Sequence, residues 1–276
     1  MSAPVALHLS PHPDDEAIGA VAALLALRSA GWRVVNYACG LGRPAQQERR
    51  RAELAEACRR ADFELIVGDP PLRMSAGDDL AGAERELLAR LLELAGTLAP
   101  VLVVSPSPHD GHHAHELVAR VARSLVEHFV HEPPTWWMWG LWADLPFPTV
   151  VVPFDEPRLV QAQGVLAAHA GEVERNDYVA LIEARARANA VLGVERVWGT
   201  GASAAAGTAM VELLCEAQFT PRGWLLGAPR VLDPERPLAP PSDRPIGWWL
   251  RSESPRTSLA RHVADGGGNQ AATSGQ

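Results

Sequence analysis

The 276-residue sequence contains no lysine, so all 25 of its basic residues are arginines, and 33 acidic residues outnumber them. The resulting net charge of −8 provides no broad basic surface and argues against a protein that coats nucleic acid. Three cysteines (Cys39, Cys58 and Cys215) are too few and too scattered for a disulfide framework or a cysteine-based zinc site. No apolar run approaches the roughly 18 residues of a membrane span. The N-terminus also lacks the basic segment of a signal peptide. We therefore expect a cytoplasmic protein without a membrane span.

Short apolar runs alternate with helical patterns over the first 130 residues. Residues 5–9, 32–39, 63–67 and 101–105 have the pattern of buried strands, whereas residues 16–30, 46–61, 80–98 and 112–129 have helical periodicity. Each strand is apolar on both faces, which is typical of a parallel sheet covered on both sides. The sequence thus predicts a doubly wound, mostly parallel (Rossmann-like) α/β sheet with helices on both faces.

Beyond residue 130 the pattern is looser. Residues 136–142 contain four tryptophans, a strand is predicted at 150–154 and helices at 159–170 and 177–192, and residues 208–219 fit either a strand or a short helix. We predict a single α/β domain over residues 1–232, a proline-rich C-terminal extension over 233–265 and a disordered tail over 266–276.

The loop after the first strand carries one imidazole and three carboxylates, at His12, Asp14, Asp15 and Glu16. An acid in the first helical turn, such as Glu16, is explained by the helix dipole. The helix dipole does not explain two adjacent aspartates beside a histidine, because their negative charges repel unless a positive group lies among them. A divalent metal is the natural candidate.

A second polar loop follows the fourth strand, with histidines at positions 109, 112, 113 and 115. His112 and His115 are three residues apart and share one face at the start of a helix. His109 and His112 have the same spacing further into the loop, so either pair fits. Because ligands of open α/β sheets bind at the carboxyl ends of the strands, both loops are expected to meet at one site.

These residues resemble the PIG-L/LmbE-like zinc-dependent N-deacetylases, which include N-acetylglucosaminyl deacetylases. The first family motif, His-Pro-Asp-Asp-Glu, stands intact at residues 12–16, and the second, Gly-His-Pro/Ser-Asp/Asn-His, is similar to residues 111–115 with Ala114 in place of Asp or Asn. Arg50 and Glu53 resemble a family Arg-x-x-Glu segment, and residues 167–170 resemble its Ala-His-Ser-Gln segment. The resemblance covers roughly residues 4–220.

The resemblance implies a role for each matched residue. His12, Asp15 and His115 would hold one zinc ion per chain, and Asp14 would be the general base. His112 would stabilise the oxyanion or protonate the leaving amine. The implied reaction removes an acetyl or other acyl group from the amine of an N-acylated amino sugar or its conjugate, such as a glycolipid, a thiol-sugar or a natural product. Ala114 departs from the family pattern, and this leaves the His109–His112 register open.

Three further residues are candidates for substrate binding. Arg50 either pairs with Glu53 on a solvated helix face or clamps a hydroxyl or phosphate of the substrate. The tryptophans at 136–142 either pack as a lid and core or, through Trp139 and Trp142, offer a platform for a sugar ring or acyl chain. Two alternative functions remain open: an amidase acting on a larger thiol-sugar conjugate, and a carbohydrate-binding relative without catalytic activity that no longer holds metal.

Overall fold

The computed structural model describes residues 3–203 and 209–258. Its strands are β1 (Val5–Ser10), β2 (Arg33–Ala38), β3 (Glu64–Val67), β4 (Leu102–Pro106), β5 (Thr135–Trp139), β6 (Val150–Phe154), β7 (Met210–Thr220), β8 (Gly223–Gly227), β9 (Arg230–Val231) and β10 (Pro241–Pro245). Its α-helices are α1 (Asp15–Ile18), α2 (Val21–Ser29), α3 (Gln47–Ala61), α4 (Leu80–Leu98), α5 (His113–His128), α6 (Glu156–Leu166), α7 (Ala170–Arg175), α8 (Tyr178–Trp198) and α9 (Gly247–Arg251).

The strands form a mixed sheet in the order β10-β8-β7-β5-β4-β1-β2-β3, with β6 and β9 branching from β7. The five strands from β5 to β3 are parallel, and β7, β8 and β10 continue the sheet in antiparallel pairs. The predicted mostly parallel α/β fold is confirmed. The chain moves outward from β1 in one direction through β2 and β3, and in the other through β4 and β5. The loops after β1 and β4 therefore flank the switch point, where open sheets of this type bind ligands.

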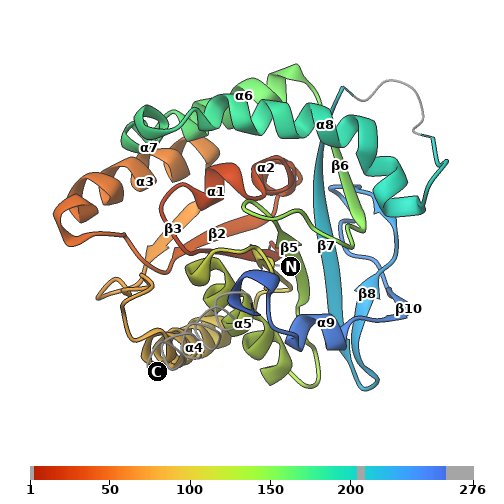
Figure 1. Cartoon of the computed structure of the whole chain (residues 1–276), viewed down its shortest axis with the longest axis horizontal. Helices are drawn as coiled ribbons and strands as arrows, with labels where there is room; N and C mark the ends of the chain where they lie inside the picture. Colours follow the sequence, from red (N-terminus) through yellow and green to blue (C-terminus); the bar gives the residue numbers. More distant parts are fainter. Residues whose placement is uncertain (1–2, 204–208, 259–276) are drawn as a thin grey trace, which may run out of the picture.

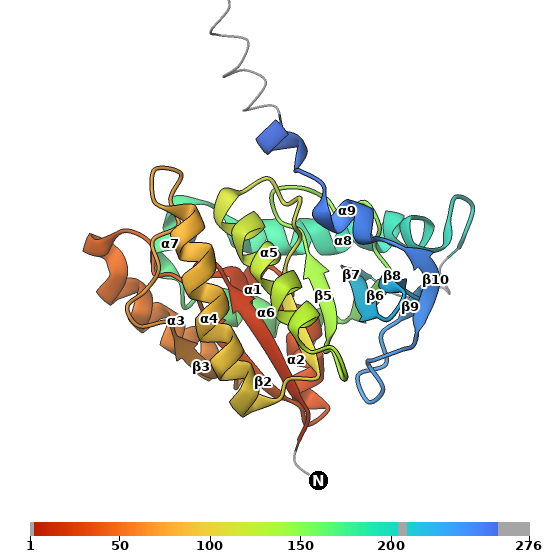
Figure 2. The ribbon, with the colours of Figure 1, turned by 90° about the horizontal axis from the view of Figure 1, so that it is seen from below.

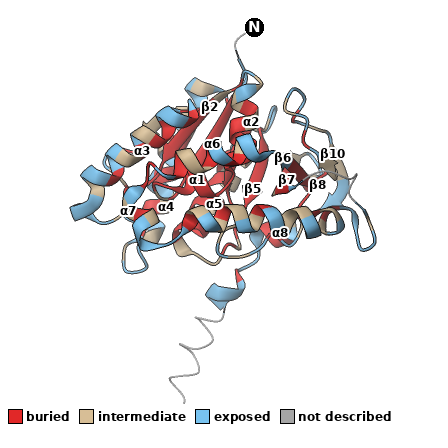
Figure 3. Cartoon of the chain, turned by 90° about the horizontal axis from the view of Figure 1, so that it is seen from above, coloured by how far each residue is buried: buried red, intermediate tan, exposed pale blue. Residues whose placement is uncertain are grey.

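Helices cover both faces of the sheet (Figure 1). Helices α1, α2, α3 and α6 lie on one face, and α4 and α5 lie on the other. Successive residues of a strand point to opposite faces, so Ala6 packs in the first core and Leu7 in the second. Burial follows the same layers, with buried strands inside and helices exposed only on their outer sides (Figure 3). Because both faces of the central strands are buried, most of the residues in these strands are apolar.

Three elements differ from the sequence-based expectation. The helix predicted at 16–30 is broken into α1 and α2 at Ala20, whose φ of −141° and ψ of 35° are not helical. The preceding Gly19 packs so closely on Trp139 that a Cβ there would lie 2.5 Å from the ring. The aromatic stretch is largely strand β5, and the ambiguous segment at 208–219 forms strand β7 over its described part.

The proline-rich stretch after residue 232 contributes to the sheet. Residues Pro241–Pro245 form β10, which pairs with β8 at the edge of the molecule (Figure 2). The domain boundaries proposed from sequence stay a prediction, and residues 266–276 lie outside the described part. Within residues 3–203 and 209–258, none of the helices combines the length and the apolar character needed to cross a bilayer.

Candidate functional site

The loops after β1 and β4 meet, as their positions at the switch point predict. Ligand atoms of His12, His112 and His115 all lie within 4.8 Å of one another. Asp15 lies between two of these rings, with Oδ2 at 3.4 Å from His12 Nδ1 and Oδ1 at 3.5 Å from His115 Nε2. Residues that are 103 positions apart in the chain thus form one cluster of imidazoles and a carboxylate.

The first loop turns sharply at Asp14, a non-glycine residue with φ 122°. Its backbone N–H donates to Glu16 Oε2 at 3.2 Å, and its carbonyl accepts from Ala17 at 2.9 Å. Asp15 then begins α1, and its carboxylate accepts the His12 backbone N–H at 2.7 Å. Both carboxylates line a cavity of about 520 Å³ that the histidine cluster also lines. Their surroundings differ, because Asp15 contacts two imidazoles, whereas the charges that act most strongly on Asp14 are those of Asp15 and Arg50.

The surroundings shift the pKa values of Asp14 and Asp15 in opposite directions. Burial, together with the neighbouring Asp15 carboxylate, raises the pKa of Asp14 well above its usual range, and Arg50 offsets only part of this effect. Burial also disfavours the charged form of Asp15, but the adjacent His115 and His12 outweigh it and hold the pKa of Asp15 below its usual range. A carboxylate that remains charged beside a carboxyl that readily takes a proton is the pattern of a ligand beside a base.

A third carboxylate, Asp110, orients His115 from behind. Its Oδ2 accepts from His115 Nδ1 at 2.7 Å, and its Oδ1 accepts the backbone N–H groups of Leu141 at 2.5 Å and Trp142 at 3.1 Å. Because Nδ1 donates to Asp110, the Nε2 lone pair of His115 is left for the cluster. Sequence reasoning assigned no role to Asp110. Nothing in the local sequence pattern indicates that Asp110 contacts His115.

The remaining histidines of the second loop separate into two groups. His112 precedes α5, and burial together with the nearby rings of His12, His115 and His113 lowers its pKa to about 3. Its Nδ1 is buried without a hydrogen-bond partner. His109 points elsewhere, since its Nε2 lies 2.8 Å from the carbonyl oxygen of Trp249 and its ring stacks on that residue. The structure thus brings His112 and His115 to His12, but not His109.

Behind the first loop lies a buried pair, Glu16 and His169, whose Oε1 and Nε2 are 2.5 Å apart. Both side chains are fully buried. Glu16 also accepts the Asp14 N–H through its other oxygen, so the pair supports the strained turn that carries Asp14. His169, expected from sequence to be a packed histidine, is packed, and its partner lies 153 residues away.

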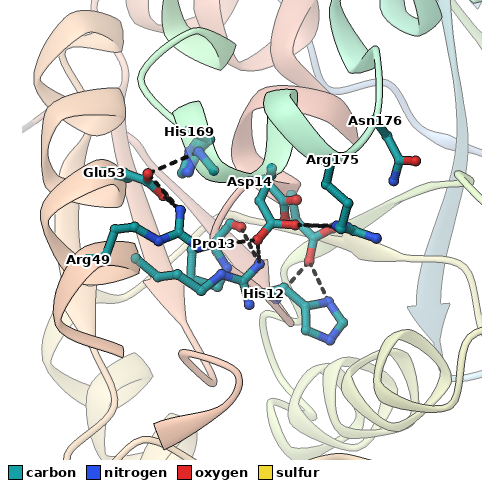
Figure 4. A network of polar contacts seen from close by, with 12 residues as sticks. His12, Pro13, Asp14, Arg49, Glu53, His169, Arg175 and Asn176 are labelled. Atoms are coloured by element: carbon teal, nitrogen blue, oxygen red, sulfur yellow. Dashed lines mark hydrogen bonds and ion pairs between the residues drawn. The ribbon is translucent and has the colours of Figure 1, made fainter. Parts of the chain in front are cut away.

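The cavity wall contains two of the three predicted substrate residues. Arg50 is only 8% exposed and its Nη2 lies 3.0 Å from Glu172 Oε1. The neighbouring Arg49, not Arg50, pairs with Glu53 at 2.7 Å. Trp142 is 54% exposed and stacks on His112 with 5.9 Å between ring centres. Figure 4 shows how Asp14, Arg49 and Arg175 lie around the space above His12.

Trp139 does not reach the cavity. Its ring is fully buried, packs edge-on against His115 with 5.3 Å between ring centres, and donates through Nε1 to His8 Nε2 at 3.2 Å. Of the two tryptophans considered for a substrate platform, the structure therefore places Trp142 in the cavity wall and Trp139 beneath the cluster.

A comparison with protein-family models matches residues 7–126 to PIG-L, described as GlcNAc-PI de-N-acetylase. Residues 7–126 therefore resemble a PIG-L domain. The matched segment contains both motifs on which the family resemblance was based, and that expectation is confirmed. A search of curated proteins found no match.

Several solved structures share the fold of this chain. The A40926 pseudoaglycone deacetylase Dbv21 aligns with a TM-score of 0.61 and 15% identity, over 78% of this chain and 96% of that one. The 4-carboxy-2-hydroxymuconate hydratase GalB from Pseudomonas putida KT2440 aligns with a TM-score of 0.58 and 17% identity, over 83% and 98%. The N,N'-diacetylchitobiose deacetylase from Pyrococcus horikoshii aligns with a TM-score of 0.55 and 16% identity, over 79% and 87%. At these identities the likeness shows the fold alone.

The cluster of His12, Asp15, His112 and His115 has the composition of a metal centre. Imidazole nitrogens and a carboxylate oxygen are the ligands that zinc takes in catalytic sites. His115 has a carboxylate at its second nitrogen, as metal-binding histidines almost always do. The buried Nδ1 of His112 has no partner in the described part of the chain. The donor set therefore fits a divalent metal such as zinc.

Proposed function

We propose that the protein is a zinc-dependent N-deacetylase that hydrolyses the amide of an N-acylated amino sugar or its conjugate. The observation that carries this proposal is the arrangement of the cavity: the Asp14 carboxyl, the cluster of His12, Asp15 and His115, and the His112 imidazole border the same space. An amide is a weak electrophile with a poor leaving group. Its hydrolysis needs a Lewis acid, a base and a proton for the amine.

His12, Asp15 and His115 would hold the zinc ion. A zinc ion with three protein ligands polarises the amide carbonyl and lowers the pKa of a bound water to about 7. Asp110 would keep the Nε2 lone pair of His115 available for this purpose. The charged Asp15 fits the role of ligand, since its pKa is held low by its two histidine neighbours.

Asp14 takes the proton from the attacking water. Its carboxyl lies in the cavity wall beside the ligand Asp15, and its raised pKa makes it a stronger base than an ordinary aspartate. Once protonated, Asp14 holds the proton that the amine nitrogen needs as the carbon–nitrogen bond breaks.

His112 stabilises the negative charge that develops on the carbonyl oxygen. Because its pKa is lowered to about 3, its ring is neutral at pH 7 and acts as an N–H donor. Stacking against Trp142 restricts the ring orientation. A neutral donor of this kind favours the oxyanion role over protonation of the amine, the other role that the family resemblance allows.

The cavity accommodates a small-molecule sugar. Its volume of about 520 Å³ lies within the range of small-ligand sites. The exposed ring of Trp142 offers a flat apolar face for a pyranose or an acyl chain, and Arg50 offers N–H donors to polar substituents. The three cysteines are buried free thiols, which is consistent with the reducing cytoplasm that we propose as its location.

The test combines zinc content with release of amine and acetate from N-acetylglucosamine derivatives. We expect about one zinc per chain and equimolar acetate and amine, which distinguishes hydrolysis from hydration. Asp14→Asn should retain zinc and lose turnover by about 10²–10⁴-fold, and His112→Ala should also retain zinc and lose rate. His115→Ala should lose zinc.

Two results would change the assignment. If His112→Ala emptied the site while His115→Ala did not, the ligand roles would be exchanged. Protein without zinc and without turnover after zinc-replete expression would favour the carbohydrate-binding alternative.

A further inference from the structure

The walls of the active-site cavity carry an excess of positive charge. Five arginines line the cavity against three carboxylates, although the chain as a whole has a net charge of −8. The arginines are Arg43, Arg49, Arg50, Arg175 and Arg256, and the carboxylates are Asp14, Asp15 and Glu172. The zinc ion proposed above would add to this excess.

Within the cavity wall, the single carboxylate of Glu172 lies within ion-pair distance of three guanidinium groups. Glu172 lies 2.8 Å from Arg175, 3.0 Å from Arg50 and 3.9 Å from Arg49. Arg49 is also paired with Glu53. Arg50 shares Glu172 with these two arginines, and its one further hydrogen bond to a described residue is a long one of 3.4 Å to the carbonyl oxygen of Pro13.

Arg50 retains unused hydrogen-bonding capacity. Its side chain is almost completely buried, and its Nε has no hydrogen-bond partner in the described chain. Its Nη1 lies against Gly42, a residue with φ +73° where a Cβ would collide with the guanidinium. A buried N–H group without a partner is costly, which favours a ligand that completes its hydrogen bonds.

Two further arginines at this cavity lack a carboxylate partner. Arg43 follows Gly42 and is exposed, and its side chain forms no ion pair or hydrogen bond with any described residue. Arg256 donates to the carbonyl oxygen of Gly111 at 2.5 Å, beside His112. The segment that carries Arg256 is attached to α5 by a hydrogen bond of 3.1 Å from Thr257 to Glu116.

We propose that Arg43, Arg50 and Arg256 form a subsite for an oxyanion, so that the substrate is an N-acyl amino sugar carrying a phosphate or a carboxylate. The substrate identity rests on the proposed deacetylase function, whereas the oxyanion subsite does not. The planar guanidinium matches the oxygens of either group and forms charge-assisted hydrogen bonds to them. A neutral sugar would leave the buried Nε of Arg50 and the excess charge uncompensated.

The first test compares three substrates of the zinc-loaded enzyme: the neutral methyl glycoside of N-acetylglucosamine, N-acetylglucosamine 1-phosphate and N-acetylmuramic acid. We expect kcat/KM to be at least about tenfold higher for one of the anionic sugars, and the better of the two identifies the anion as phosphate or carboxylate. In the double variant Arg43→Gln/Arg256→Gln this ratio should fall about tenfold or more. The matched control is Arg51→Gln/Arg85→Gln, which removes the same charge from exposed helix positions away from the cavity. It should keep the wild-type ratio.

The second test does not depend on hydrolysis. Binding of inorganic phosphate and of malonate is measured by calorimetry, and both variants are compared with the wild type. We expect the Arg43→Gln/Arg256→Gln variant to bind the preferred anion about tenfold more weakly than the control variant does. Equal affinities in the two double variants would overturn the subsite, even if amides are hydrolysed. If Arg43→Gln/Arg256→Gln loses anion binding but the wild type hydrolyses none of the sugars, the subsite is supported and the deacetylase function is refuted.

Discussion

Asp110→Asn is the substitution that examines most directly how the site is organised. The change is nearly isosteric and keeps one oxygen for the backbone N–H groups of Leu141 and Trp142. The new amide N–H₂ must then face His115 Nδ1, which at present donates to Asp110 at 2.7 Å. His115 is forced to accept at Nδ1 and to carry its proton on Nε2, the nitrogen that faces Asp15 and His12.

The magnitude follows from this change of tautomer. Replacing a group that orients a metal-binding histidine typically weakens metal affinity by about 10- to 100-fold. The lost charge-assisted hydrogen bond contributes about 1.5–3 kcal/mol, and the retained backbone contacts limit the effect on the fold. We therefore expect Asp110→Asn to weaken zinc binding by about 10- to 100-fold. The metal-free protein should melt only a few degrees lower.

Chelator competition at fixed pH measures zinc affinity, and thermal unfolding of the metal-free protein measures stability. Asp144→Asn is the matched control, because Asp144 lies in the loop after β5, is solvent-exposed and pairs only loosely with Arg185 and Arg196. If Asp110→Asn and Asp144→Asn bound zinc with the same affinity, the proposed orientation of His115 would be refuted.

Three further predictions concern the fold and the cavity. Gly19→Ala should lower the free energy of unfolding by about 1–3 kcal/mol through collision with Trp139, whereas Gly96→Ala, with open space around it, should not destabilise the fold. Burial raises the pKa of Glu212 from 4.5 to about 7, so the folded state retains a proton that the unfolded state has lost. Stability should fall by about 2–3 kcal/mol between pH 4.5 and 7, and urea unfolding of Glu212→Gln should lack this fall. Trp142→Ala should raise KM several-fold for an N-acetyl sugar in steady-state kinetics; an unchanged KM would remove Trp142 from the substrate platform.

The local sequence pattern predicts those helices and strands in which buried, apolar residues recur at regular intervals along a single element. Helix α4 and strand β6 have the bounds expected from sequence because their apolar periodicity and their ends are both local. The meeting of the two loops was also predictable, since it depends only on parallel strands presenting their carboxyl ends at one edge. The first motif could be assigned in the same way, because its five residues are contiguous.

Other features depend on contacts that no local pattern contains. Gly19 packs against a tryptophan 120 positions later, and Glu16 is paired with a histidine 153 positions away. Periodicity on α3 left open whether Arg50 lies on a solvated face. In the structure Arg49 takes the pairing with Glu53, and Arg50 faces the cavity.

The division of roles between the two aspartates has a single origin in the backbone. Asp14 adopts φ 122°, a conformation that costs a non-glycine residue about 1–3 kcal/mol and persists only where the surroundings enforce it. Here the Glu16 carboxylate holds the Asp14 N–H, and α1 begins at the next residue. The turn sends consecutive side chains into different environments: Asp15 contacts two imidazoles, whereas the charges that act most strongly on Asp14 are those of Asp15 and Arg50. Since those environments lower one pKa and raise the other, the strained turn gives two identical side chains the different properties that the proposed ligand and the proposed base require.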